Sequence, residues 1–200
     1  CLILTSTLLI GGLALAQGAP NKGVHVDPVN GFEMRFPPRW EFVPVSPAEP
    51  WIAAKYLCDQ ERYTANGQHW SFAVKPSMRV IAFSDEKLER LEGRGTPFRS
   101  YRDYIASDLP EKGLGYTYVE EGDETIRDMP VEQYLLRGTH SGLPNLGILA
   151  WVFTREQDGS SIAVEFSYYE SERDHVYRDM MAALQSFKFT ERTAEAATAH

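Results

Sequence analysis

Apolar and polar side chains alternate strictly over residues 32–36, where Phe32, Met34 and Phe36 are separated by Glu33 and Arg35. A period of two places the three apolar residues on one face, so the pattern predicts a strand with one buried and one polar face. The sequence Pro-Pro-Arg-Trp follows at residues 37–40. Because proline cannot donate a backbone hydrogen bond, we expect the strand to end there. We expect the tryptophan to close over the core, so that this stretch marks the fold and not a site of chemistry.

Similar patterns predict further strands at residues 41–43, 52–58, 70–83 (one strand or two, bent at Pro76), 115–119, 125–127, 131–137, 146–154 and 161–169. The segment 146–154 is almost entirely apolar, which is typical of a central strand buried on both faces. Asp158-Gly159 indicates a hairpin between the last two strands. The acidic run at residues 120–124 and the segment 128–130 are predicted to be turns.

Two segments show the three- and four-residue spacing of an amphipathic helix. The first follows Thr96 and Pro97, an N-cap residue and a proline at the first helical position, and is predicted to end near Pro110. Its apolar stripe consists of Phe98, Tyr101, Ile105 and Leu109. The last helix is predicted to begin with a capping box of Ser171 and Asp174. Its apolar stripe consists of Val176, Met180, Leu184 and Phe187. Residues 84–91 are predicted to form a further short helix.

Together these elements predict one α+β domain, in which a central antiparallel sheet of about six to seven strands packs against two main helices. Residues 31–189 are predicted to form this domain. Residues 17–30 contain Gly, Pro and Asn without periodicity and are expected to be a flexible tether. Residues 190–200 are small, polar and unpatterned, and are expected to be a disordered tail.

The first sixteen residues contain no charged side chain and end in Ala14-Leu15-Ala16, a small-x-small cleavage pattern. The run is too short and too glycine-interrupted for a typical membrane span, so it is predicted to be a secretory signal peptide. A lipoprotein is disfavoured because Cys1 precedes the apolar run. A retained anchor helix remains an alternative, and it would be the protein's attachment to a membrane. The predicted location is extracytoplasmic, either periplasmic or secreted.

Composition narrows the expected partners. The chain has 43% hydrophobic and 24% charged residues, as an ordinary folded protein does. Its net charge is -8, and the sequence has no Lys/Arg cluster, which argues against nucleic acid or an anionic membrane surface as a partner. After removal of the leader Cys58 is the only cysteine, so no intramolecular disulfide can form, and we expect this residue to be buried. We expect a protein partner, and a small ligand or lipid is the alternative.

Three stretches between residues 32 and 189 resemble a known family. The first is the strand at 32–36 followed by proline and Trp40, the second is Asp128-Met129-Pro130-Val131, and the third is the C-terminal Ser186-Phe187-Lys188-Phe189. In this order they are similar to the PsbP-like superfamily, which includes the extrinsic subunit of photosystem II, the yeast-type Ran-binding nuclear import factor and bacterial exported proteins of unknown function. The resemblance implies an α-β-α sandwich around a central antiparallel sheet. It implies no particular function.

No residue pattern selects a catalytic, cofactor-binding or metal site, so we predict no catalytic residue, no cofactor and no metal. A nucleophile made of Cys58 with His69 or His140 is disfavoured, because the neighbouring Asp59 and Glu61 would raise the pKa of the thiol. The histidines are scattered singly. The acidic run at 120–124 lacks the alternating ligands of a calcium loop.

Aromatic residues make up 12% of the chain, and those outside the core could line a binding groove. The residues predicted to form a surface for a partner or ligand are Trp51, Trp70, Leu143, Pro144, Tyr168 and Tyr169. Of these, Leu143 and Pro144 belong to a loop predicted at residues 141–145. The leading hypothesis is an exported, non-catalytic module that binds or helps to assemble an envelope or extracellular protein. The alternatives are a carrier of a small ligand or lipid with an aromatic-lined pocket, and a hydrolase that uses Cys58 or a carboxylate pair.

Overall fold

The protein is built around a seven-stranded antiparallel sheet with the strand order β3-β4-β7-β11-β10-β9-β8. The structure is a computed structural model, and it describes residues 23–58, 63–64, 71–72, 75–83, 98–111, 114–140 and 143–193. The strands of the large sheet are β3 (Trp40–Val43), β4 (Ile52–Cys58), β7 (Ser77–Phe83), β8 (Leu114–Ile126), β9 (Met129–His140), β10 (Leu143–Thr154) and β11 (Ser161–Tyr169). A smaller sheet with the order β1-β2-β12 consists of β1 (Val24–Asp27), β2 (Phe32–Arg35) and β12 (Lys188–Phe189). The strands β5 (Tyr63–Thr64) and β6 (Ser71–Phe72) pair with each other.

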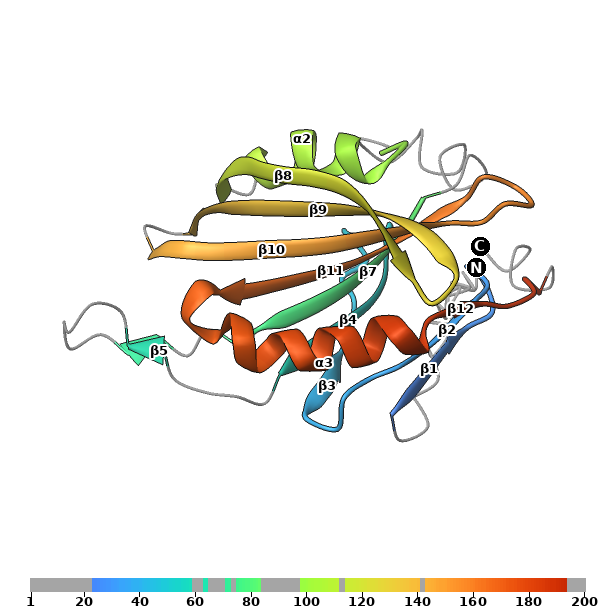
Figure 1. The fold of residues 1–200 in the computed structure, drawn as a ribbon, viewed down its shortest axis with the longest axis horizontal. Helices are drawn as coiled ribbons and strands as arrows, with labels where there is room; N and C mark the ends of the chain where they lie inside the picture. The colour runs from blue at the N-terminus through green and yellow to red at the C-terminus, as the bar shows by residue number, and fades with distance from the viewer. Residues whose placement is uncertain are drawn as a thin grey trace, which may run out of the picture.

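Helices cover both faces of the large sheet. They are α2 (Tyr101–Glu111) and α3 (Arg173–Ser186), the latter preceded by the 3-10 turn η1 (Glu170–Glu172). Figure 1 shows α3 running across one face and α2 lying beside β8. Successive side chains of β10 point to opposite faces of the sheet, so that Trp151 belongs to the core beneath α3 and Val152 to the core beneath α2. The predicted α+β sandwich is therefore confirmed. None of the helices in the described ranges is long and apolar enough to span a bilayer.

Several predicted elements occur where the residue pattern places them. The bounds of β4 and β11 match the predicted strands 52–58 and 161–169. In β10 every residue from 146 to 153 is buried, and the strand lies between β9 and β11, as expected for a central strand. The last helix buries Val176, Met180 and Leu184 of its predicted stripe, and Phe187, the residue after its end, is buried as well.

The alternating stretch at residues 32–36 also behaves as predicted. Phe32 and Met34 are fully buried and Phe36 is nearly so. Trp40 lies over the same core, where its ring contacts the Phe166 ring edge-to-face at 6.1 Å. The indole Nε1 of Trp40 donates to Oδ2 of an aspartate on α3 at 3.0 Å, so this buried ring keeps a polar partner.

The turn predicted from the acidic run at 120–124 is wrong. Strand β8 continues through this run with one irregularity between Tyr118 and Glu120, and the chain reverses at Arg127 and Asp128. Residues 120–123 of this edge strand are exposed, and charged residues on an edge strand oppose unwanted pairing. The acidic run is therefore compatible with a strand at this position.

The segments expected to be a tether and a disordered tail contain ordered structure. Residues 24–27 form β1, which pairs with β2, so the tether prediction is wrong for this part. Asp27 then closes the following turn, because its Oδ1 accepts from two backbone N–H groups at 3.0 and 2.9 Å. At the other end, the backbone N–H of Thr190 donates to the Gly31 carbonyl at 2.8 Å, and that of Thr193 donates to the Pro28 carbonyl at 3.1 Å. Residues 1–22, with the predicted leader, and 194–200 lie outside the described residues.

The predicted helix starts differ from the observed ones. Helix α3 follows the 3-10 turn, and its N-cap residue Glu172 makes no side-chain capping bond, so the predicted capping box is wrong. Helix α2 begins at Tyr101, where the Ser100 hydroxyl accepts from the Asp103 N–H at 3.2 Å. Thr96 and the predicted short helix at 84–91 lie outside the described residues.

Candidate binding groove beside helix α2

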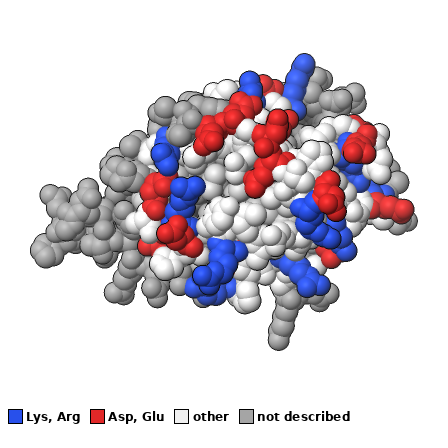
Figure 2. All heavy atoms as spheres, viewed as in Figure 1, with Lys and Arg blue, Asp and Glu red and all other residues white. Residues whose placement is uncertain are grey.

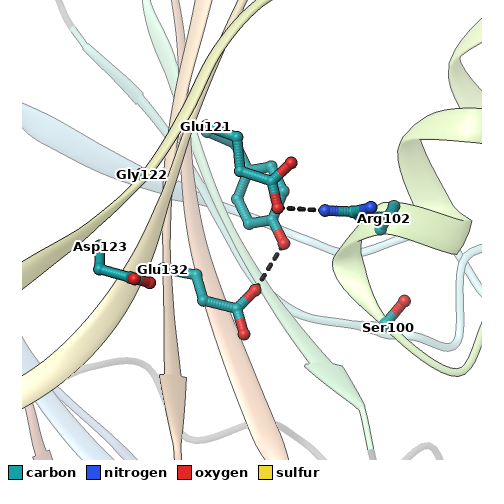
Figure 3. Close-up of a pocket in the computed structure, with 7 residues that line it drawn as sticks. Ser100, Arg102, Glu121, Gly122, Asp123 and Glu132 are labelled. Carbon is teal, nitrogen blue, oxygen red and sulfur yellow. Dashed lines mark hydrogen bonds and ion pairs between the residues drawn. The ribbon is translucent and has the colours of Figure 1, made fainter.

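A groove with an acidic lining lies between the first turn of α2 and the outer strands β8 and β9 (Figure 3). It has a volume of about 500 Å³. We call it the acidic groove, and its lining residues are Ser100, Arg102, Glu121, Gly122, Asp123, Glu132 and Tyr134.

The register of the β8–β9 pair brings the groove's acidic residues together. Glu121 lies opposite Tyr134, and Asp123 lies opposite Glu132. Residues that are directly opposite in an antiparallel pair point to the same face, and so do residues two positions apart along one strand. All four side chains therefore lie on the face that α2 covers, and Glu121 lies next to Arg102 of its first turn (Figure 3).

Contacts fix most of these side chains. The guanidinium of Arg102 forms an ion pair with Glu121, and the Tyr134 hydroxyl donates to Oε2 of Glu132 at 2.5 Å. Within the described ranges, the carboxylate of Asp123 has no hydrogen-bond or ion-pair partner. The groove thus holds three carboxylates against one guanidinium. Its local charge is negative, which suits a cationic group on a binding partner.

A buried charged pair lies beneath α2, behind the acidic groove. Nε of Arg79 on β7 donates to Oε1 of Glu165 on β11 at 2.8 Å, and Nη2 of Arg79 contacts the same oxygen. The Tyr101 hydroxyl of α2 donates to the other oxygen, Oε2, at 2.8 Å. The ring of Tyr101 also packs against the ring of Tyr134 at 5.2 Å, so this network supports the groove wall.

This network is suited to structure and not to catalysis. Glu165 is fully buried, so no substrate can reach its carboxylate. Burial, followed by the neighbouring Glu165 charge, raises the pKa of Tyr101 well above its usual value and keeps the phenol a neutral donor. Burial lowers the pKa of Arg79, but Glu165 outweighs this effect and the net direction is upward. The guanidinium of Arg79 therefore stays charged, and the hydrogen bond from Tyr101 to Glu165 anchors α2 to the sheet.

Of the predicted surface residues, the structure describes the side chains of Trp51, Tyr168 and Tyr169. Trp51 is half-buried and contacts the Phe98 ring edge-to-face at 5.1 Å, near the start of α2. Trp70 lies outside the described residues. Leu143 and Pro144 belong to β10, so the loop predicted at 141–145 is wrong from residue 143 onward, although their side chains lie outside the described part. The β9–β10 register shifts between residues 143 and 146, and such an irregularity accommodates a proline within a sheet.

The predicted exposure of Tyr168 and Tyr169 is wrong, because the two side chains are only 1% and 2% exposed. The reason for Tyr168 lies on the neighbouring strand. Its partner across the β10–β11 pair is Gly147, and a Cβ atom at Gly147 would lie 2.8 Å from Cζ of the Tyr168 ring. The glycine thus leaves the space that the tyrosine ring fills, as aromatic residues do opposite glycines in sheets.

The other candidate groups give no reactive centre. Cys58 is 1% exposed within the core beneath α3, as predicted, and His69 and the His140 side chain lie outside the described residues. Among the side chains that the structure describes, no three His, Cys, Asp or Glu residues are placed to hold a metal ion.

Residue patterns alone pointed to the acidic run at 120–124 but not to the groove. The missing partners were Arg102, Glu132 and Tyr134, which come from two other elements. The two-residue hairpin loop between β8 and β9 could have predicted one pair of the groove. Its length fixes the strand register, and this register places Asp123 opposite Glu132.

Comparison with known proteins identifies the fold. No protein-family model matches the sequence, and no curated protein sequence matches it. Among solved structures, the cyanobacterial PsbP (CyanoP) from Synechocystis sp. PCC 6803 is similar, with 19% identity, a TM-score of 0.54 and coverage of 90% of this chain and 99% of that chain. The Ran-binding protein Mog1p of Saccharomyces cerevisiae is also similar, with 9% identity, a TM-score of 0.50 and coverage of 86% and 97%. Both likenesses concern the fold, and they agree with the one that the sequence resemblance implied.

Proposed function

Because the chain has the PsbP-like fold, we propose that it is an exported, non-catalytic module that binds a protein partner in the cell envelope or outside the cell. The acidic groove carries this proposal. It is accessible to solvent, its lining is fixed by contacts from three elements, and Asp123 offers a carboxylate with no partner among the described residues. The partner segment that suits it contains Lys or Arg.

Two further observations support a binding role. The Saccharomyces protein with this fold is described as Ran-binding, so the fold is compatible with recognition of another protein. In this chain the groups most suited to chemistry, Cys58 and Glu165, are buried in the two cores. By contrast, the charged residues of the acidic groove are largely exposed. A lipid carrier would need an apolar lining, whereas this groove has one aromatic residue, Tyr134.

Site-specific photo-crosslinking in the native host tests the proposal. A photoreactive phenylalanine fits at Gly122, because a Cβ atom there meets no atom within 4 Å. The matched control carries the same group at Tyr177, which is 41% exposed on α3. We expect a specific adduct from position 122 but not from position 177, and we expect the double variant Asp123→Asn, Glu132→Gln to remove it. The captured protein must then bind the purified chain directly.

The test also separates binding from edge protection, the other role of acidic residues on an edge strand. If the double variant aggregates while its purified monomer still binds the captured protein with unchanged affinity, the acidic residues only protect the edge. Absence of direct binding by any captured protein would refute the binding role.

Export is part of the proposal and is tested separately. We expect mass spectrometry of the protein isolated from its host to show an N-terminus just after Ala16. A cytoplasmic protein that keeps residues 1–16 would contradict the extracytoplasmic location.

A further inference from the structure

A second groove lies where the C-terminal end of α3 meets β2 and the turn between β8 and β9. It has a volume of about 620 Å³. We call it the basic groove, and its lining residues are Glu33, Arg35, Phe36, Pro37, Pro38, Arg127, Ala182, Gln185, Ser186 and Lys188. In the surface view, basic side chains border this region of the molecule, whereas acidic side chains gather over β8 and β9 (Figure 2).

The charges of this groove oppose the charge of the whole protein. Three cations line it against one carboxylate, although the chain has a net charge of -8. The carboxylate of Glu33 is already paired with Nζ of Lys188 at 3.1 Å. The exposed guanidinium of Arg35 has no hydrogen-bond or ion-pair partner among the described residues. A positive charge therefore remains available to a ligand.

The negative end of helix α3 does not cancel this charge, because its last carbonyls have donors. The Ser186 hydroxyl donates to the Ala183 carbonyl at 2.6 Å, the Phe187 N–H donates to the Leu184 carbonyl at 3.0 Å, and Nη1 of Arg127 donates to the Gln185 carbonyl at 3.3 Å. These bonds satisfy the end of the helix and reduce the effect of its dipole on an anion.

Arg127 reaches this position from a backbone conformation that few residues adopt. Its φ is +49°, in the left-handed region that glycine tolerates and other residues enter at a cost. Glycine is the usual residue for such a position in a two-residue hairpin loop. Arginine here places a guanidinium at the rim of the groove, next to the end of α3.

The backbone beside the groove is already paired, so recognition must use side chains. Strand β12 pairs with Phe32 and Glu33 of β2 and does not reach Arg35. At Arg35 the backbone N–H donates instead to Oγ of Ser186 at 2.7 Å. Pro37 and Pro38 have no N–H to donate. The groove thus offers guanidinium groups, which bind carboxylates with two parallel hydrogen bonds, beside the apolar surfaces of Pro37 and Pro38.

We propose that the basic groove binds an acidic segment of a protein partner, with its Asp or Glu carboxylates on Arg35 and Arg127. This inference rests on the proposed function and adds a second docking site of opposite charge. A second copy of the chain does not suit the groove, because two molecules with a net charge of -8 repel each other. The same net charge disfavours an anionic membrane surface.

Nuclear magnetic resonance with the purified chain tests the inference. The probe is a short peptide rich in glutamate, and the control is the same peptide with glutamine at those positions. We expect the glutamate peptide to shift amide signals of residues 33–36, 127 and 185–188, with a response that weakens as salt is added. Shifts with both peptides, shifts spread over all basic residues, or no shifts would overturn the inference.

Two variants and a matched control sharpen the test. Arg35→Gln removes the unpaired guanidinium, and Arg127→Gly removes the second charge while glycine keeps the turn at a positive φ. We expect each to weaken binding of the glutamate peptide about tenfold. Arg99→Gln, at an exposed arginine near α2, should leave binding unchanged. Equal losses in all three variants would mean that the peptide senses only overall charge, and would overturn the proposed site.

The inference and the proposed function can fail separately. If the partner captured at position 122 binds directly but the glutamate peptide does not bind, the basic groove fails and the proposed function remains. If the peptide binds the groove but no captured protein binds directly, the proposed function fails.

Discussion

Glu165→Gln tests whether the buried pair with Arg79 holds α2 on the sheet. Glu165 is fully buried and accepts from Arg79 and from the Tyr101 hydroxyl, while the Arg79 side chain is only 12% exposed. Glutamine would leave the guanidinium buried without a counter-charge, and only one of its two terminal atoms could accept a hydrogen bond. Breaking a buried pair in this way costs about 3–5 kcal/mol. That is a large part of the roughly 5–15 kcal/mol by which domains are stable.

Urea unfolding followed by tryptophan fluorescence measures this loss. With a slope of about 2 kcal/mol per molar urea, we expect the midpoint to fall by about 2 M. Tyr101→Phe removes one hydrogen bond to the carboxylate and should cost about 1.5–3 kcal/mol. The control Glu156→Gln lies on an exposed turn and should change stability by less than about 0.5 kcal/mol.

The double variant Arg79→Met, Glu165→Leu decides the interpretation. It removes both charges and restores apolar packing, so we expect it to be much more stable than Glu165→Gln. The reasoning is refuted if Glu165→Gln shifts the midpoint no more than the Glu156 control, or if the double variant is less stable than the single one.

Three further predictions concern other parts of the fold. Burial lowers the pKa of His25, whose ring is buried and lies 3.0 Å from the Tyr56 hydroxyl oxygen, so the unfolded chain takes up a proton at this residue before the folded protein does as pH falls. The contribution of His25 to thermal stability should therefore be constant above about pH 6.5 and should decrease below it. His25→Phe should make the stability depend less steeply on pH in this range. Gly147→Ala should destabilise by about 1–3 kcal/mol in urea unfolding, because its Cβ would lie 2.8 Å from the Tyr168 ring; a stability equal to that of the native protein would contradict this contact. Arg155→Met should remove hydrogen bonds to backbone carbonyls of both terminal segments, and hydrogen exchange there should speed up while the β11 core stays protected; unchanged exchange would show that Arg155 does not hold these segments.

The strands of the core could be predicted from the sequence because their signal is local. A strand such as 161–169 alternates between two environments, and a shift by one residue would reverse every side chain, so its position is strongly specified. The acidic part of β8 carries no such signal, since an edge strand with its polar residues in solvent resembles a turn in composition. Asp27 and the residues around it were also missed, because their order depends on pairing with β2 and with the C-terminal segment.

The grooves could not be predicted because their residues meet only through long-range register and packing. Asp123 and Glu132 become neighbours through the β8–β9 hairpin, whereas Arg102 arrives from a helix. Aromatic residue type did not predict an exposed surface, because Tyr168 is buried against a glycine on another strand. Residue type predicts burial poorly when the neighbouring strand supplies the space.

The stretch Gly-Phe-Glu-Met-Arg-Phe-Pro-Pro-Arg-Trp illustrates how one pattern can serve two purposes. Its apolar residues face the core, which is why it marks the fold. The same alternation turns Glu33 and Arg35 outward, and Pro37 and Pro38 end the strand without backbone donors beside the C-terminal end of α3. The outward residues of the stretch therefore line the basic groove. A segment constrained by packing on one face can hold its other face in a fixed geometry, and this rigidity makes the outer face of β2 a suitable place for recognition.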